Sequence, residues 1–586
     1  MIKRLSPLFP YLRRYWRSFA LGGLALVVYN TAKAMVPLLV GGAIDDMQHG
    51  LSVMKIEHHA LRLLAVAVVS GIALYLTRQI IIGASREIEF DLRNDLFAHL
   101  ESQPPEFYQR NRTGDIMARS TNDLNAVRQL LGPAIMYSAN TVVFTALALP
   151  FMLRISPRLT LFAFLPLPFA SVLVQYFGAK IHTRFERIQA MFSDISAQAE
   201  ENFSGARLIR AFAQEEAQIA AFETSNQEYI RRSLMLARLM AMLWPTLEFV
   251  LGLSLMITLL VGGREVVLHH ISVGDYTSYS VYMVQLTWPM IAIGWVVNLV
   301  QRGAASVVRI DQIMQEKPSI DDSGADPSLQ GAPIAGTIEL RDLSFSYVPG
   351  TPVLREISLE IPAGSSLAIV GPTGSGKTTL VSLIPRLYEA AAGAVLIDGR
   401  PIAEYPLHTL RAAIGFVPQE TFLFSTTIAD NIAFGDTETT ARAHESVVEA
   451  ARTAHIATEI GEFPAGFETV VGERGLTLSG GQKQRTAIAR ALLRQPSILI
   501  LDDALASVDT YTEEQILSEL REVMQNRTTI LIAHRVSTAR NADRIAVLVD
   551  GRIAELGTHD ELLARGGYYT DLFEKQSLDE EILTAQ

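Results

Sequence analysis

The sequence predicts an α-helical membrane domain of six transmembrane helices with long cytoplasmic extensions, followed by an α/β domain. Three observations predict this fold class. Six long apolar runs lie within residues 18–300. A glycine-rich loop, Gly371-Pro-Thr-Gly-Ser-Gly-Lys-Thr378, follows an apolar β-like run and precedes a helical stretch. A second apolar run, Ile498-Leu-Ile-Leu, ends in two adjacent carboxylates, Asp502 and Asp503.

Length and composition bound the possible functions. A chain of 586 residues is too long for one hydrophobic core, which indicates at least two domains. The net charge of −11 argues against a nucleic-acid partner bound through a general basic field. The chain has no cysteine, which excludes disulfides, thiolate zinc sites, iron–sulfur clusters and a cysteine nucleophile.

The apolar runs predict membrane spans. The first run is too long for the apolar region of a signal peptide and is not followed by a small-residue cleavage site, so we expect it to be retained. All six runs are about long enough to cross a bilayer. They lie at residues 18–44, 60–84, 131–153, 157–178, 240–262 and 276–300.

The gaps between the spans predict orientation. The gaps 85–130 and 179–239 are long and rich in helix formers, so the spans should continue as helices outside the membrane. Lysine and arginine gather in these two gaps and in the N-terminal segment, and they are sparse in the other loops. The positive-inside bias therefore places the N-terminus and the C-terminal half in the cytoplasm, in a multi-pass protein of the cytoplasmic (inner) membrane.

Two charged residues, Lys33 and Glu248, fall inside the first and fifth spans. Charges within a membrane usually face a cavity or each other, which would give a polar internal path. The alternative is that the spans are offset and both residues lie near a headgroup region.

Composition also marks the domain boundary. Residues 315–336 are rich in Pro, Gly, Ser and Asp and show little periodicity, which is typical of a linker. We therefore expect a transmembrane domain at 1–314, a linker at 315–336 and a nucleotide-binding domain at 337–586.

The glycine-rich loop fits the pattern G-x-x-x-x-G-K-[ST] in the strand–loop–helix context that a phosphate-binding loop needs. Its glycines let backbone N–H groups converge on phosphate oxygens, and the start of the following helix favours negative charge. Lys377 would reach the β- and γ-phosphates, and Thr378 would hold Mg²⁺. The predicted nucleotide-binding residues of this loop are Gly371, Thr373, Gly374, Ser375, Gly376, Lys377, Thr378 and Thr379.

Two further motifs complete the site. Asp502 stands at the end of a buried strand, where it suits the Mg²⁺ shell. The segment Leu478, Ser479, Gly480, Gly481, Gln482 begins a helix with exposed N–H groups, which form a second seat for an anion.

Together these three motifs resemble those of the ABC transporter superfamily. Six spans followed by one ATPase domain are similar to an exporter half-transporter of the bacterial multidrug and lipid-export type. The resemblance implies a P-loop ABC ATPase domain that hydrolyses ATP with Mg²⁺ and drives export of small amphipathic molecules by alternating access. It also implies a second half-transporter as partner, with ATP held between the phosphate loop of one chain and the LSGGQ segment of the other.

The resemblance assigns roles to further residues. Tyr347 resembles the aromatic residue that stacks on adenine, Gln419 the glutamine that touches Mg²⁺, and His534 the histidine that senses the γ-phosphate. Glu473 and Asp509 resemble interface residues, on the loop that contacts the cytoplasmic helices and on the loop that crosses the dimer. Segments 113–123 and 201–212 look like those whose short coupling helices dock on the ATPase domains.

One departure from the family pattern concerns the acid after the strand aspartate. The family usually has Glu, which polarises the attacking water, whereas this chain has Asp503. Asp is shorter by one methylene, roughly 1.5 Å of reach against a proton-transfer window of about 2.6–3.2 Å. Such a misplacement costs on the order of 10²-fold in rate. The loop also carries Ala506 where the family usually has Ser.

This departure favours a heterodimer. Some heterodimeric exporters resemble this chain in one subunit, with Asp at the catalytic position and an intact LSGGQ. The chain would then hold ATP at a slow site of its own and complete an active site on a different chain. Two alternatives remain: a homodimeric lipid or drug exporter with both sites active, and a peptide exporter without a protease domain.

Overall fold

The computed structural model describes residues 2–48, 52–435, 442–472, 475, 478–505, 515, 516, 518, 524 and 527–584. Contacts divide them into two compact units. The first unit comprises the chain up to Glu101 together with Arg112–Glu316, and the second comprises Ser102–Asn111 together with the chain from Lys317 onward. The short segment Ser102–Asn111 therefore interrupts the first unit in sequence and belongs to the second by its contacts.

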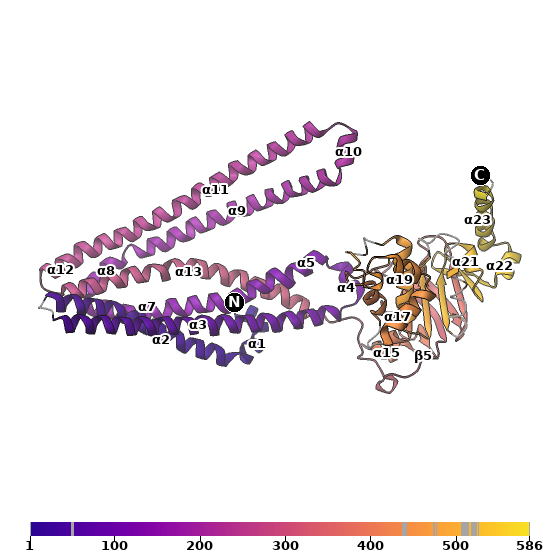
Figure 1. Ribbon diagram of the computed structural model, residues 1–586, viewed down its shortest axis with the longest axis horizontal. Coiled ribbons are helices and arrows are strands. Elements are labelled where there is room, and N and C mark those ends of the chain that lie inside the picture. The colour runs from indigo at the N-terminus through magenta and orange to yellow at the C-terminus, as the bar shows by residue number, and fades with distance from the viewer. Residues whose placement is uncertain are drawn as a thin grey trace. The chain divides into compact units, whose positions relative to one another are not determined.

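The first unit is built from helices (Figure 1). In chain order they are η1 (Ile2–Leu8), α1 (Phe9–Arg14), α2 (Trp16–Gln48), α3 (Val53–Glu101), α5 (Thr113–Ala118), η2 (Arg119–Asp123), α6 (Leu124–Gln129), η3 (Leu130–Ala134), α7 (Ile135–Ile155), α8 (Pro157–Phe164), α9 (Leu167–Ser204), α10 (Ala206–Ala211), α11 (Glu215–Ile257), η4 (Thr258–Gly262), α12 (Gly263–Val267) and α13 (Val273–Met314).

Five helices in the described part of the chain are long and apolar enough to cross a membrane. They are Trp16–Gln48, Val53–Glu101, Thr113–Ile155, Glu215–Val267 and Val273–Met314, and they contain five of the six expected spans. The expected fourth span, 157–178, is divided between α8 and α9, with Leu165 and Pro166 between them. Proline lacks a backbone N–H and its ring clashes with the preceding turn, which explains a break at this position. The helical membrane fold class is confirmed.

Small residues allow close helix contacts in this unit. Gly41 of α2 faces the backbone of Gly274 at the start of α13, and a Cβ on either glycine would collide with the other chain segment. Asp45 then fixes the contact, because its carboxylate accepts from Gly274 N at 2.7 Å and from Ser272 Oγ at 2.6 Å. Since lipid supplies no hydrophobic drive between helices, close packing and hydrogen bonds of this kind hold such bundles together.

The helices α9 and α11 run side by side and are joined through α10 (Figure 1). Apolar side chains on this hairpin are exposed within the chain: Phe203 is 81 % exposed, Phe212 67 % and Ile219 65 %. Large apolar side chains exposed on one hairpin are uncommon on a monomeric protein in water and mark a contact surface.

The second unit contains two sheets. A four-stranded sheet has the order β2-β1-β4-β5, with β1 (Ile338–Phe345), β2 (Leu354–Ile361), β4 (Val395–Ile397) and β5 (Arg400–Pro401). A six-stranded sheet has the order β10-β9-β3-β8-β7-β6, with β3 (Ser366–Val370), β6 (Ile414–Val417), β7 (Ile498–Asp502), β8 (Thr528–Ile532), β9 (Arg544–Val549) and β10 (Arg552–Gly557). Strands β9, β3, β8, β7 and β6 are parallel to one another, and β10 pairs antiparallel with β9.

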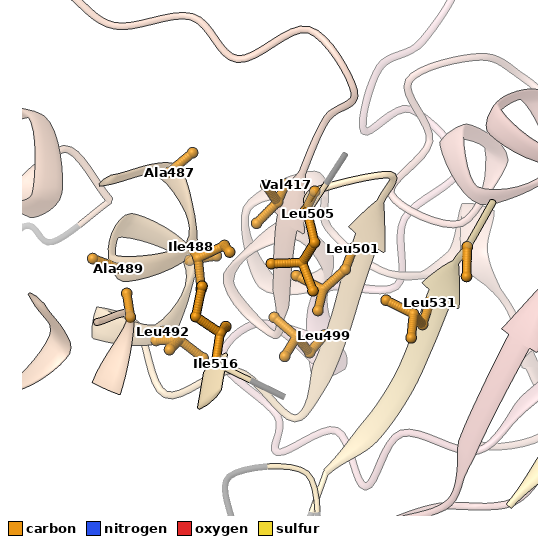
Figure 2. Close-up of a cluster of buried hydrophobic side chains, with 14 of the residues drawn as sticks. Val417, Ala487, Ile488, Ala489, Leu492, Leu499, Leu501, Leu505, Ile516 and Leu531 are labelled. Atoms are coloured by element: carbon orange, nitrogen blue, oxygen red, sulfur yellow. The ribbon is translucent and has the colours of Figure 1, made fainter. Parts of the chain in front are cut away.

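Both faces of the six-stranded sheet are buried, because alternate residues of its strands point to opposite faces. Ile498 and Ile500 of β7 pack toward the four-stranded sheet, whereas Leu499 and Leu501 belong to the other cluster. Figure 2 shows that second cluster, in which Ile488 and other side chains of α19 (Gly480–Leu493) lie near the strand residues. A near-continuous apolar strand is the expected sequence of a sheet covered on both sides.

Among its described residues, the second unit also contains the helices α4 (Pro105–Arg110), α14 (Lys377–Leu383), α15 (Leu407–Ala412), α16 (Ile428–Ala433), α17 (Arg442–Thr453), α18 (Ala457–Glu462), α21 (Val536–Ala539), α22 (His559–Arg565) and α23 (Tyr568–Thr584), with short turns η5 (Pro327–Leu329), η6 (Ile402–Glu404) and η7 (Gly466–Glu468). Residues 317–336, most of the expected linker, hold only the short turn η5, and hydrogen bonds attach them to this unit. Asp322 accepts from Leu407 N at 2.7 Å, and Gly331 N donates to Thr409 Oγ1 at 2.9 Å.

Candidate active site

Four adjacent parallel strands bring the expected catalytic groups to one edge of the six-stranded sheet. The loop 371–376 follows β3, Asp502 ends β7, His534 comes shortly after β8 and Gln419 shortly after β6. The carboxyl ends of parallel neighbours meet at the same edge, where α/β proteins bind their ligands. The sheet order β3-β8-β7-β6 therefore assembles groups that are far apart in the sequence.

The loop 371–376 adopts a backbone that favours glycine. The φ angle is +149° at Gly371, +82° at Gly374 and +101° at Gly376, all in the region that L side chains rarely enter. A Cβ at Gly371 would collide with the backbone oxygen of Leu548. Helix α14 begins directly after the loop, so that its first free N–H groups lie beside it. This is the arrangement that the sequence predicts for a phosphate cradle.

Lys377 lies at the mouth of this loop. Its side chain is largely buried, and Nζ donates to Gly371 O at 2.9 Å and to Pro372 O at 3.0 Å. Burial lowers the pKa of the Lys377 ammonium, while the carboxylates of Asp503 and Asp502 oppose the shift. Within the described residues, the buried hydroxyl of Ser375 has no hydrogen-bond partner. An ammonium and an unsatisfied hydroxyl beside converging N–H groups fit a polyphosphate.

Asp502 is almost completely buried, with 1 % of its surface exposed. Its Oδ1 accepts a hydrogen bond from Thr378 Oγ1 at 3.1 Å. Burial raises the pKa of the Asp502 carboxyl and the neighbouring Asp503 adds to the rise, whereas the Thr378 hydrogen bond, Lys377 and His534 oppose it. A hydroxyl and a carboxylate oxygen that converge in this way suit Mg²⁺, which prefers oxygen ligands.

Asp503 has an unusual backbone, with φ at +50°. Asp and Asn enter this left-handed region more readily than other side chains that carry a Cβ. Its Oδ2 lies 3.9 Å from His534 Nε2, and the Gln419 side chain is near enough to its carboxyl to oppose the rise of its pKa. Burial raises the pKa of the Asp503 carboxyl, and His534, Gln419 and Lys377 oppose the rise. The three residues predicted to act in catalysis therefore lie together.

Tyr347 stands directly after β1, near the start of α14. It is 44 % exposed, and its hydroxyl is 3.0 Å from Thr379 Oγ1. Its ring also meets that of Phe345 edge-on, with the centroids 5.0 Å apart. A fixed ring with an open surface suits stacking on a nucleotide base.

The segment 478–482 forms the start of α19, as the sequence predicts. Ser479 is the N-cap and makes a reciprocal capping box with Gln482, with Ser479 N donating to Gln482 Oε1 at 2.9 Å. Gln482 Nε2 donates to Glu459 Oε2 of α18 at 2.9 Å, and the other carboxylate oxygen of Glu459 forms an ion pair with Arg485 at 2.6 Å. Gly480 and Gly481 open the helix, Leu478 is buried before it, and α19 packs against β6.

Three residues named from the sequence lie outside the described part of the chain, namely Glu473, Ala506 and Asp509. The two intramembrane charges are described. Lys33 is half-buried, and its Nζ lies 4.6 Å from the centre of the buried Phe144 ring. Glu248 is exposed within the chain. The two residues proposed to line a cavity therefore have different surroundings: the Lys33 ammonium lies over an aromatic ring of a neighbouring helix, whereas Glu248 has an exposed side chain.

The structure adds two residues that the motifs did not indicate. Gln109 of α4 donates from Nε2 to Tyr388 Oη at 2.7 Å, and the Tyr388 ring meets the Tyr347 ring edge-on at 5.1 Å. Segment 102–111, which contains α4, groups with the second unit, whereas the expected docking segment 113–123 groups with the first. No motif marks Gln109 or Tyr388, because their relationship depends on a contact between remote segments.

Comparison with known proteins agrees with this geometry. The family described as ABC transporter transmembrane region matches residues 19–290, and the family described as ABC transporter matches residues 354–506. The first match covers most of the helical unit, and the second covers the loop after β3, the α19 segment and the two aspartates.

Several relatives are similar over nearly the whole chain. The multidrug resistance-like ATP-binding protein MdlA of Escherichia coli (strain K12) is 37 % identical over 97 % of this chain and 96 % of its own length. The probable multidrug resistance ABC transporter ATP-binding/permease protein YheI of Bacillus subtilis (strain 168) is 36 % identical over 99 % of this chain and 98 % of its own. An ATP-dependent lipid A-core flippase of Syntrophus aciditrophicus (strain SB) is 35 % identical over 96 % and 93 %.

A solved structure is similar in fold. It is described as a bacterial Atm1-family ABC exporter with ATP bound, and it matches with a TM-score of 0.77 and 28 % identity over 96 % of this chain and 98 % of that chain. The resemblance inferred from the motifs is thereby confirmed. The chain belongs to the ABC transporter family, as a multi-pass inner-membrane exporter whose ATPase domain binds nucleotide and couples ATP hydrolysis to transport.

Proposed function

We propose that this chain is one half of a heterodimeric exporter for small amphipathic molecules such as drugs or lipids, and that Asp503 makes its own ATP site slow. In this proposal the transmembrane domain is residues 1–314, the linker 315–336 and the ATPase domain 337–586. The observation that carries the proposal is the position of Asp503, a short carboxylate on a left-handed backbone whose Oδ2 lies 3.9 Å from His534 Nε2.

The need for a second chain follows from the sheet. Strands β3 and β6 are separated by β8 and β7, which corresponds to about 14 Å at roughly 4.8 Å per strand. The phosphate loop follows β3, whereas α19 with its LSGGQ start packs against β6. The two anion seats of one chain thus lie over different parts of the sheet, which supports an ATP site completed by a partner. The exposed apolar side chains of α9 and α11 support a partner as well.

Each residue at the sheet edge has a task that its geometry supports. Lys377 and the loop N–H groups would bind the β- and γ-phosphates, and the open ring of Tyr347 would stack on the base. Thr378, Asp502 and Gln419 would hold Mg²⁺, which neutralises charge on the transferring phosphate when it is bound. Ser479, Gly480 and Gly481 would face the phosphates of the partner's nucleotide.

In this proposal hydrolysis is slow because Asp503 is poorly placed to take a proton from the water that attacks the γ-phosphate. A general base must lie within hydrogen-bond distance of the proton that it takes. Asp503 extends one methylene less than Glu from a backbone fixed by its bond from Asp503 N to Ile532 O, at 3.2 Å. Binding would be retained, because Lys377, Thr378 and Asp502 do not depend on that reach.

The names of the relatives support the substrate class. They include multidrug resistance proteins and a lipid A-core flippase, and both drugs and lipid A are amphipathic. Homodimeric exporters with two active sites and peptide exporters remain the alternatives for this chain.

The ATPase activity of the purified chain alone, reconstituted in nanodiscs, tests the heterodimer proposal. We expect nucleotide binding with turnover close to that of Asp503→Asn. Robust turnover of the native chain that Asp503→Asn abolishes would contradict the proposal and favour an active homodimer. Asp502→Asn serves as the control for loss of the Mg²⁺ site.

A further inference from the structure

A glutamine of the C-terminal helix α23 binds the backbone of the segment that carries His534. Gln576 Nε2 donates to His534 O at 2.7 Å, and Gln576 Oε1 accepts from Val536 N at 2.8 Å. One side-chain amide thus uses its donor and its acceptor on backbone groups that flank Arg535. The His534 imidazole, on the same short segment, is the group that lies 3.9 Å from Asp503 Oδ2.

The backbone that Gln576 binds lies between two regular elements. Strand β8 ends at Ile532, and α21 begins at Val536. Arg535 is the N-cap of α21, and its side chain makes no capping hydrogen bond. The first N–H groups of a helix have no acceptor within the helix, and Val536 N is one of them. Gln576 therefore supplies from another helix an acceptor that α21 does not provide for itself, and it fixes His534 O with the same amide.

Helix α23 is anchored in the hydrophobic core, so that its glutamine is held in place. The positions i, i+3, i+4 and i+7 on one face of α23 are Tyr569, Leu572, Phe573 and Gln576. Tyr569 has no exposed surface, and Leu572 and Phe573 pack against the buried cluster that also contains residues of α21. A polar side chain at the end of an apolar face is costly unless it is hydrogen-bonded. The two bonds to the segment after β8 explain a glutamine at this position.

We propose that Gln576 is a positioning residue for ATP hydrolysis, which keeps the His534 imidazole beside the γ-phosphate by fixing the backbone of 534–536. The inference rests on the proposed role of His534 as the residue that senses the γ-phosphate. Gln576 bonds only backbone atoms of this segment, so its effect on the nucleotide passes through His534. Misplacement of a catalytic group by about 1 Å can cost on the order of 10²-fold in rate, which makes such a support necessary.

Nucleotide binding by the full-length chain in nanodiscs tests the proposal, with Mg²⁺ and either ADP or the imido analogue of ATP. These two probes differ by the γ-phosphate, so the ratio of their affinities reports the contacts made to that group. Gln576→Met keeps the approximate length and volume of the side chain and removes both hydrogen bonds. We expect the preference for the ATP analogue to fall about fivefold, the worth of one typical hydrogen bond, while the affinity for ADP stays native.

Two further variants separate positioning from a general loss of structure. His534→Ala should reduce the preference at least as much as Gln576→Met does. The variant with both changes should lose no more than His534→Ala, because Gln576 acts through the imidazole that this change removes. Lys575→Leu, at the exposed neighbouring position of α23, is the matched control and should keep the native preference.

Three results would overturn the proposal. They are a native preference in Gln576→Met, a larger loss in the double variant than in His534→Ala, and a loss in Lys575→Leu equal to that in Gln576→Met. A native preference in His534→Ala would instead refute the proposed role of His534 at the γ-phosphate, and the positioning role of Gln576 would fall with it.

Discussion

His534 Nε2 lies 3.9 Å from Asp503 Oδ2, where β8 and β7 end side by side in the six-stranded sheet. The distance allows an ion pair but is longer than a direct hydrogen bond. A group between the two side chains could contact both of them. Pairing of β7 with β8 fixes the backbone next to both residues. The length of the Asp503 side chain therefore decides how close its carboxylate comes to a water molecule between them.

Lengthening the acid should restore turnover. Asp503→Glu adds one methylene, roughly 1.5 Å of reach toward a water above the γ-phosphate, and we expect the ATPase rate of the purified chain to rise by about 10- to 100-fold. The left-handed backbone at this position disfavours Glu somewhat, which limits the gain. Phosphate release checks this, with Asp503→Asn as the matched control; an Asp503→Glu rate at or below the native rate would contradict it.

Asp503 should take up a proton at a higher pH than an ordinary aspartate does. Burial raises the pKa of Asp503, so this carboxyl takes up a proton above the usual value of about 3.9 as the pH falls. His534 opposes that rise, and His534→Asn should therefore move the titration of the Asp503 carboxyl to higher pH. Infrared titration of the carboxyl band in the two proteins measures this, with Asp503→Asn identifying the band. A band that titrates at the same or a lower pH in His534→Asn would contradict the prediction.

Asp502→Asn should stabilise the nucleotide-free protein at neutral pH. The pKa of Asp502 is raised in the folded state, so its favourable contribution is complete below the unfolded pKa and is lost as the pH rises through the folded pKa. Asn keeps an acceptor for Thr378 without the buried charge. Thermal unfolding should show a higher Tm for the variant at pH 7.5 and a smaller difference at acid pH. Addition of Mg²⁺ and ATP should raise the native Tm more than that of the variant.

The ion pair of Asp123 and Arg309 should contribute to the stability of the first unit. Asp123 is 8 % exposed and accepts from Arg309 Nε at 2.9 Å and from Ser306 Oγ at 2.9 Å, which ties η2 to α13. Asp123→Ala leaves a guanidinium without its partner and should cost about 1–3 kcal/mol, since the arginine is partly exposed.

Glu228→Ala is the matched control for this pair. Glu228 accepts from Arg231 and Arg232 at 2.6–2.7 Å, but these groups lie on the exposed surface of one helix. Exposed pairs of this kind are typically worth less than about 1 kcal/mol. Thermal unfolding in the same detergent compares the two variants, and a larger loss for Glu228→Ala would refute the ranking.

The sequence by itself determined the elements that local chemistry specifies. The phosphate loop between β3 and α14 needs positive φ angles, which glycine adopts without steric strain, and the glycines in the sequence predicted it. Ser479 and Gln482, three residues apart, likewise predicted the start of α19, where they form a capping box. Uninterrupted apolar runs predicted the membrane helices and the strands buried on both faces. The division of the fourth span at Pro166 was also encoded locally, although hydropathy alone gave it as one continuous span.

Only the tertiary structure decided which remote side chains meet. The order β3-β8-β7-β6 places His534 beside Asp503, and strand order depends on packing that no local pattern expresses. The attachment of 102–111 to the second unit and the bond from Gln109 to Tyr388 have the same origin. The position of Lys33 of α2 over the Phe144 ring also depends on tertiary structure, because that ring belongs to another helix, α7. Propensity and periodicity act over a few turns, whereas these relationships depend on shape complementarity between segments far apart in the chain.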